Sequence, residues 1–285
     1  MKSPLGLEAR LPVFDLFKDS LFLLWTKRTR LISMFLPLIL ILVVLDHFST
    51  QLQAEMFAAF EQATDTNPAV FEKNGRMIFF GLTSMLLSVL LATTVHRFSL
   101  LDPSQWPPNA LRVPTRYDLK YLLRLIVVIL ASAFVGGIAV MLASVVLASV
   151  MGPEEAVKLS AVVAVPCLML MIYVMARLSV TLPEIAIGTE GSDLGRAWRM
   201  SQGNGSRLVI VVLALPLLVS SPFLLLANVG NTVTDIIAAF GAYFMTLISI
   251  TVLSLSYQFL VEFYEPQEDE QVVAEDNKDD SGMDA

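Results

Sequence analysis

The sequence predicts an all-α protein, a polytopic transmembrane helical bundle of about six spans with cytoplasmic interfacial amphipathic helices. Three observations indicate this fold class: 55% of the residues are hydrophobic, only 16% are charged, and the mean hydropathy is +0.69. Soluble globular domains usually hold about 25% charged residues. A spanning helix needs roughly 20 apolar residues to cross a hydrocarbon core of about 30 Å. A chain of 285 residues therefore holds about five to seven spans and has no room for a second, soluble domain.

Residues 1–30 are predicted to form a cytoplasmic amphipathic segment that precedes the first span. Its apolar residues recur at spacings of three and four, with acidic and basic residues on the other side, which is typical of a helix that lies in the membrane interface. These apolar residues are Phe14, Phe17, Leu21, Leu24 and Trp25. The alternative is that the segment is only the lead-in to a spanning helix. The first apolar run begins at Leu31 and ends without a small-residue cleavage site, so no cleaved signal peptide is expected.

Residues 31–263 are predicted to form the six-span transmembrane domain. The six apolar runs cover 31–45, 77–95, 125–153, 159–176, 208–228 and 236–261. The interval 49–76 is too polar to cross, and the prolines between 103 and 114 indicate an extended connector. Small residues recur at four-residue spacing around Gly136 and Gly137, which predicts the third span as the tightly packed centre of the bundle.

The distribution of cations predicts the orientation. Six spans place both termini on one side. On that side the N-terminal segment and two loops hold 15 Lys and Arg and the tail one more, against three in the opposite loops. Positively charged loops stay in the cytoplasm, so both termini are expected there, in a bacterial inner membrane.

Residues 264–285 are predicted to form a disordered acidic cytoplasmic tail. Ten of the 26 acidic residues lie between Glu262 and Asp284, in a stretch low in aromatics. Without this tail the chain is roughly neutral, and no nucleic-acid partner is expected. The single cysteine, Cys167, lies in an apolar run and is expected to be a small buried residue.

The polar interval between the fourth and fifth spans holds most of the candidate site residues. Arg177 lies at the inner end of the fourth span, and Glu184 follows seven residues later, on the same face if the helix continues. One interpretation is that Arg177 extends its guanidinium to the lipid headgroups. The alternative is an arginine that pairs with the following loop or binds a lipid phosphate.

A short helix from Asp193 to about Ser201 is predicted in the same interval, with Ser192 as its cap and glycine-rich residues after it. Trp198 on this helix, with Arg196 and Arg199 at its flanks, suits contact with headgroups, although any interfacial loop shows similar features. Together with Arg177, Glu184 and Trp25, these residues are the candidates for binding a lipid or a protein partner. The expected partners are membrane lipids and other inner-membrane proteins.

The same interval carries a resemblance to a known family. Leu-Pro-Glu-Ile-Ala at 182–186 and Asp-Leu-Gly-Arg-Ala-Trp-Arg-Met-Ser-Gln-Gly-Asn-Gly-Ser-Arg-Leu at 193–208 resemble the central motif of a bacterial multi-span family. This family includes the membrane domain of some glycerophosphodiester phosphodiesterases and stand-alone inner-membrane proteins. The similarity is strongest over 176–210, and a second tryptophan expected near Ser206 is missing. The chain has no residues that match the catalytic barrel, so the resemblance implies a membrane domain without hydrolase activity.

The chemistry of the spans favours a protein that is not an enzyme. No nucleotide-binding loop, nucleophile elbow or zinc-protease motif is present, and no cofactor is expected. The predicted topology places His47 and His96 at opposite membrane faces, so they cannot share a metal. The first hypothesis is a non-enzymatic module that binds lipid or a protein partner through cytoplasmic interfacial helices. The second is a transporter or permease subunit, whose pathway would follow the proline-containing fourth and fifth spans.

Overall fold

The computed structural model describes residues 10–62, 68–189, 193–229 and 231–280, and within these ranges every regular element is a helix. The side chains of residues 58–74, 153–158 and 264–280 lie outside the description. Six of the described helical segments are long and apolar enough to span a membrane: Arg28–Phe57, Gly75–Leu100, Arg116–Met151, Leu159–Ile187, Gly205–Ala227 and Thr232–Phe263. The chain is thus an all-α polytopic bundle, and the predicted count of six spans is confirmed.

Helix α1 (Val13–Thr26) is separate from the first span, because the helix is interrupted at Lys27 before α2 (Arg28–Gln62) begins. Leu16, Ser20 and Leu24 are buried against the bundle, whereas Phe14 and Trp25 are 76% and 70% exposed. The helix therefore has one apolar face that packs and a second one that stays open. Residues 1–9 of the predicted N-terminal segment lie outside the described residues.

Helices α2 and α3 (Pro68–Leu100) form an antiparallel pair, in which Phe35 and Phe98 meet edge to face at 5.8 Å between ring centroids. Helical backbone extends into the polar interval 49–76 from both sides, to Gln62 in α2 and from Pro68 in α3. The proline-containing connector spans residues 101–115, with a 3₁₀ turn at η1 (Pro103–Gln105).

Helices α4 (Arg116–Met151) and α5 (Pro153–Leu178) form a hairpin that turns at Gly152 with φ = 87°. A Cβ on Gly136 would come within 3.0 Å of Met171, so this glycine allows the two helices to approach closely. The prediction that the third span forms the centre of the bundle is wrong, since only 17% of its most apolar stretch is buried. Of its two glycines, Gly136 lies against Met171 of α5 and Gly137 lies in open space.

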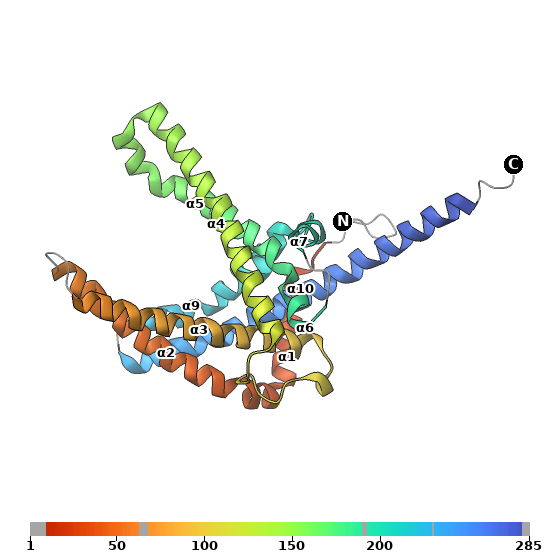
Figure 1. Cartoon of the computed structure of the whole chain (residues 1–285), viewed down its shortest axis with the longest axis horizontal. Coiled ribbons are helices and arrows are strands. Elements are labelled where there is room, and N and C mark those ends of the chain that lie inside the picture. The colour runs from red at the N-terminus through yellow and green to blue at the C-terminus, as the bar shows by residue number, and fades with distance from the viewer. Residues whose placement is uncertain (1–9, 63–67, 190–192, 230, 281–285) are drawn as a thin grey trace.

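The centre of the bundle is α10 (Thr232–Asp280), because 44% of its most apolar stretch is buried. It contacts α1, α2, α3 and α9 (Leu215–Ala227). Figure 1 shows α2, α3 and α9 extending to one side while the α4–α5 hairpin diverges from them. Helix α10 continues to Asp280, so its helical backbone enters the segment 264–285 that was predicted to be disordered. This stretch up to Asp280 contains no glycine and several strong helix formers.

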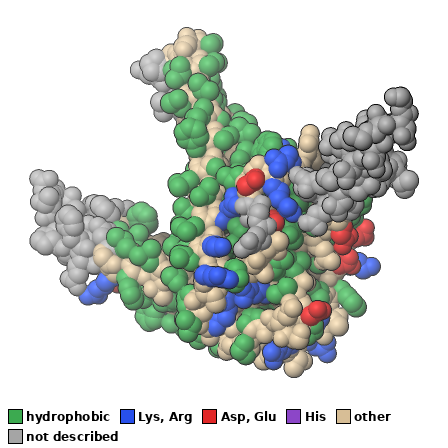
Figure 2. Space-filling model, turned by 45° about the vertical axis from the view of Figure 1, so that its right-hand side comes forward, with side chains coloured by type: hydrophobic (Ala, Val, Ile, Leu, Met, Phe, Trp, Pro, Cys, Tyr) green, Lys and Arg blue, Asp and Glu red, His purple; other side chains and the backbone are tan. Residues whose placement is uncertain are grey.

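We call the end of the bundle that holds α1 and residues 101–115 the basal end. The fourth span ends with η2 (Ser179–Thr181) and α6 (Leu182–Ile187), and the fifth begins with α8 (Gly205–Val209) and the π-helical η3 (Ile210–Ala214). Helix α7 (Leu194–Met200) lies between these two spans. Figure 2 shows Lys and Arg side chains gathered around this end, whereas the projecting hairpin carries mostly hydrophobic side chains.

The contact between α9 and α10 generates a first prediction. A Cβ on Gly241 would lie 2.1 Å from the Phe223 ring, whereas a Cβ on Gly137 would meet nothing within 4 Å. We expect Gly241→Ala to destabilise the protein by about 1–3 kcal/mol through overpacking. Thermal unfolding in detergent can be followed with a thiol-reactive dye, because Cys167 is the only cysteine and is 8% exposed. Gly137→Ala is the matched control, and equal melting of the two variants would contradict the observed packing.

Candidate functional site

Arg177, at the end of α5, lies inside the basal end and is 6% exposed. Its Nε donates a hydrogen bond of 2.9 Å to Ser201 Oγ, and Nη2 donates to the carbonyl of Trp198. The guanidinium also stacks on the Trp198 indole, with Cζ 3.5 Å from the ring centroid. The interpretation that Arg177 extends to the headgroups is therefore wrong, because its donors are directed to α7. Arg177 is joined to the segment that follows its span, but its partner there is α7 and not Glu184.

Glu184 is completely buried on α6 and forms an ion pair with Arg196 Nη2 at 3.5 Å. The turn η2 interrupts α5 before α6 begins, so the face shared by Arg177 and Glu184 on a continuous helix does not exist. A buried carboxylate requires a cationic partner, because its desolvation is otherwise very costly. Arg177 and Glu184 thus hold α7 from two sides.

The cap of α7 differs from the predicted one. Asp193 accepts a hydrogen bond of 2.5 Å from the backbone N–H of Arg196, while Ser192 lies outside the described residues. The loop after α7 includes Gly203 with φ = 80°, a conformation that favours glycine. Trp198 remains 43% exposed, and Arg199 is also exposed, so these two candidates face outward from the basal end.

The segment after α7 also anchors α1, a role that the sequence reasoning missed. Asn204 Oδ1 accepts a hydrogen bond of 2.8 Å from the N–H of Leu11, and Arg207 Nη1 donates one of 2.9 Å to the Leu11 carbonyl. Both contacts join residues more than 190 positions apart in the sequence. The signal available in the sequence was the presence of two polar residues, Asn204 and Arg207, directly before an apolar span.

A second polar network at the basal end holds the connector 101–115 against α3 and α4. Arg112 forms a two-pronged contact with Asp118, with both distances at 2.6–2.7 Å, and Thr93 donates to the same carboxylate. Nearby, His96 is completely buried between Ser254 and Tyr121. Every one of these groups bonds to another element of the bundle, which indicates a structural role.

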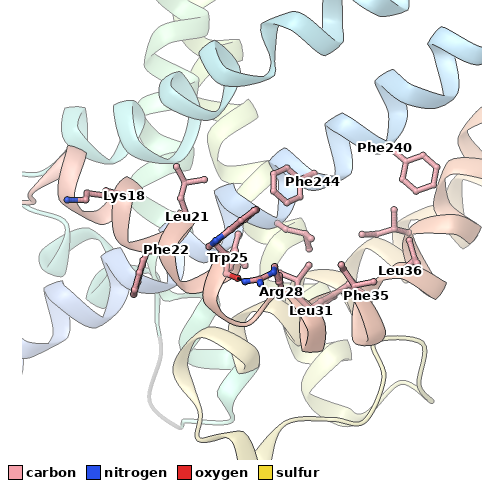
Figure 3. Close-up of a pocket in the computed structure, with 14 residues that line it drawn as sticks. Lys18, Leu21, Phe22, Trp25, Arg28, Leu31, Phe35, Leu36, Phe240 and Phe244 are labelled. Carbon is pink, nitrogen blue, oxygen red and sulfur yellow. Dashed lines mark hydrogen bonds between the residues drawn. The ribbon is translucent and has the colours of Figure 1, made fainter.

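An apolar groove of about 720 Å³ lies between α1, α2 and α10. Figure 3 shows Trp25 and Arg28 side by side at the junction of α1 and α2, with Phe240 and Phe244 on the α10 wall. Of the sequence-predicted site residues, only Trp25 lines it. The other lining residues are Lys18, Leu21, Phe22, Leu24, Arg28, Leu31, Ile32, Phe35, Leu36, Ile39, Phe240, Phe244 and Leu247.

Two smaller cavities follow α9 and α10 and share Phe223, Leu224 and Ala242. The one at the end opposite the basal end is lined by Asp46, His47 and Asp235 among others. Tyr243 donates a hydrogen bond to Asp46, and His47 contacts Gln51 at 3.0 Å. Within the described residues, no three His, Cys, Asp or Glu side chains are placed so that they could hold a metal ion together.

The contacts of Arg177 generate a second prediction. Arg177→Ala removes a buried cation–π contact and two hydrogen bonds, so we expect a loss of about 2–4 kcal/mol of stability. Arg177→Lys keeps the charge without the planar stacking, so its stability should lie between that of the wild type and that of Arg177→Ala. Dye labelling of Cys167 during heating measures both, and Arg116→Ala, at an exposed position, is the control. An unchanged melting temperature for Arg177→Ala would mean that the stacked arrangement does not form.

Comparisons of the chain with protein-family models, curated proteins and solved structures give no match. The resemblance to the membrane domain of glycerophosphodiester phosphodiesterases stays a prediction. Function is therefore argued from the geometry of the groove and the basal end.

Proposed function

We propose that the chain is a non-enzymatic integral membrane protein that binds a membrane lipid at its basal end. The observation that carries this proposal is the groove between α1, α2 and α10, of about 720 Å³, with twelve apolar residues among its fourteen lining residues. A cavity of this size and composition suits a small molecule with a long apolar part. In a membrane the most abundant such molecules are the lipids themselves.

The position of α1 supports a lipid as the ligand. Its exposed apolar side chains include Phe14, Phe22 and Trp25, at 76%, 68% and 70% exposure. Aromatic side chains on a short helix next to a span are typical of the membrane interface, where the rings lie at the level of the headgroups. The groove thus opens beside a helix that itself favours contact with lipid.

The residues of the interval 177–207 receive two different roles in this proposal. Arg177, Glu184 and Arg196 hold α7 within the fold, which makes them positioning residues. Trp198 and Arg199 are exposed and supply a further contact with headgroups. A charge reversal at Arg196 would break its pair with the buried Glu184, so it tests folding more than lipid binding.

The proposed location is the inner membrane of a bacterium, with the basal end and both termini in the cytoplasm. The cations of the termini and of the loops around the basal end support this orientation by the positive-inside rule. Interaction with other inner-membrane proteins through the same helices remains part of the proposal.

A transporter subunit is the second candidate, and the cavities along α9 and α10 favour it. Both cavities lie along α9 and α10, and one of them is lined by residues of the π-helical turn η3 and by Pro216. π-Helical turns occur frequently at functional sites. Both cavities border the fifth and sixth spans, and one of them also borders the first span, whereas the sequence placed a pathway along the fourth and fifth.

Filling the groove tests the proposed function. Leu36 lines the groove and is 40% exposed, so Leu36→Trp adds bulk inside it. We expect the wild type to keep lipid after gentle release from the membrane and Leu36→Trp to lose it by about tenfold, a difference of ~1.4 kcal/mol. Native mass spectrometry in mild detergent measures the lipid-bound fraction.

Leu142→Trp is the matched control, because Leu142 is 56% exposed on α4, away from the groove. Its lipid occupancy should equal that of the wild type. A wild type without bound lipid, or equal losses in both variants, would contradict lipid binding in the groove.

A further inference from the structure

We infer that the lipid in this groove is an anionic phospholipid, whose phosphate is bound by Arg28, while Lys18 adds a second positive charge to the lining. This inference rests on the proposed function, since it names the class of lipid that the same groove selects.

Arg28 is the cation that the fold directs to the groove. Its Nη1 donates a hydrogen bond of 3.2 Å to the carbonyl of Trp25, and its guanidinium lies over the Trp25 indole at 5.1 Å. These contacts orient the group and use one of its five N–H donors. The remaining donors suit a phosphate, which arginine binds through two parallel hydrogen bonds.

The neighbouring Lys27 is directed elsewhere. Its ammonium lies 4.6 Å from the ring centroid of Trp106 and 5.8 Å from that of Phe98, so it faces the connector 101–115. Two consecutive cations at the α1–α2 junction thus have different roles. Lys27 stabilises the connector, and Arg28 faces the groove.

The charge of the groove favours an anionic ligand. Lys18 and Arg28 line it, and its fourteen lining residues, all in the described part of the chain, include no acid. Asp15 and Asp19 of α1 lie outside this lining, and within the described residues Lys18 makes no ion pair. Figure 3 shows Lys18 on α1 at one end of the lining, well apart from Arg28 at the start of α2, so Lys18 adds positive charge along the groove and Arg28 supplies the contact at the phosphate.

The apolar part of the groove matches one leaflet. From Arg28 to Ile39 the α2 wall extends about 16 Å, at 1.5 Å per residue. This is roughly half of a hydrocarbon core of about 30 Å. Phe240, Phe244 and Leu247 form the facing wall on α10. An acyl chain that begins beside Arg28 therefore lies within the basal leaflet, with its phosphate at the interface.

The experiment compares two lipids with identical acyl chains, phosphatidylglycerol and phosphatidylcholine. Native mass spectrometry of the full chain in mild detergent, with equal amounts of both, measures the bound ratio. We expect the wild type to prefer phosphatidylglycerol by about tenfold or more. The double variant Lys18→Gln, Arg28→Gln should bind both lipids without preference, because the apolar walls are unchanged.

The control is Arg116→Gln with Lys120→Gln, two exposed cations at the start of α4, and it should keep the wild-type ratio. A second measurement needs no variant: the preference of the wild type for phosphatidylglycerol should fall as salt rises, because the contact between Arg28 and the lipid phosphate is partly open to water.

A wild type that binds both lipids equally would overturn the inference while the proposed function stands. A preference that survives in the Lys18→Gln, Arg28→Gln variant would overturn the assignment to these cations. A wild type that binds neither lipid would overturn the proposed function itself.

Discussion

The buried arginine Arg177 is the contact on which the arrangement of the basal end depends. It lies where the α4–α5 hairpin meets the rest of the bundle, and its guanidinium stacks on Trp198 and donates to Ser201. In a bilayer, helix association gains little from the hydrophobic effect, because lipid tails are as apolar as the helix surfaces. Close packing and polar contacts at the ends of the spans therefore hold the helices together.

These contacts form a continuous series from α5 to α1. Glu184 and Arg196 fix α7 beside α6, and Asn204 and Arg207 hold the backbone of Leu11. The position of α1 in turn forms one wall of the groove. A change at Arg177 is thus expected to reach the groove through α7 and α8, although Arg177 does not line it.

The spans could be predicted from the sequence because their signal is local. An uncharged run of about 20 residues has few alternatives to a spanning helix. The centre of the bundle could not be predicted in this way. Small residues near Gly136 indicate close approach but do not identify the partner, and in the structure Gly136 lies against Met171 of α5. Helix α10 became the centre through contacts with helices that are distant in the sequence.

The candidate site shows the same limit at the level of single residues. The sequence placed Trp25 at the interface, and the structure finds it in the lining of the groove. It could not show that Phe240 and Phe244, more than 200 residues later, form the opposite wall. Arg177 was misread because a lone arginine at a span end usually reaches water. Its buried position follows from donors and acceptors on α7 that only the folded chain brings near.

An apolar groove inside a bilayer is filled by hydrocarbon whatever its shape, so occupancy by an acyl chain alone is no evidence of selectivity. Exchange of one chain for another of equal length changes the free energy little, because both states are equally apolar. Discrimination between lipids must come from the polar end, where cationic side chains favour a headgroup of net negative charge over a zwitterionic one. In this groove that end is Arg28, held by the Trp25 carbonyl and indole at the break between α1 and α2. The break at Lys27 is therefore as important to the proposed site as the apolar walls.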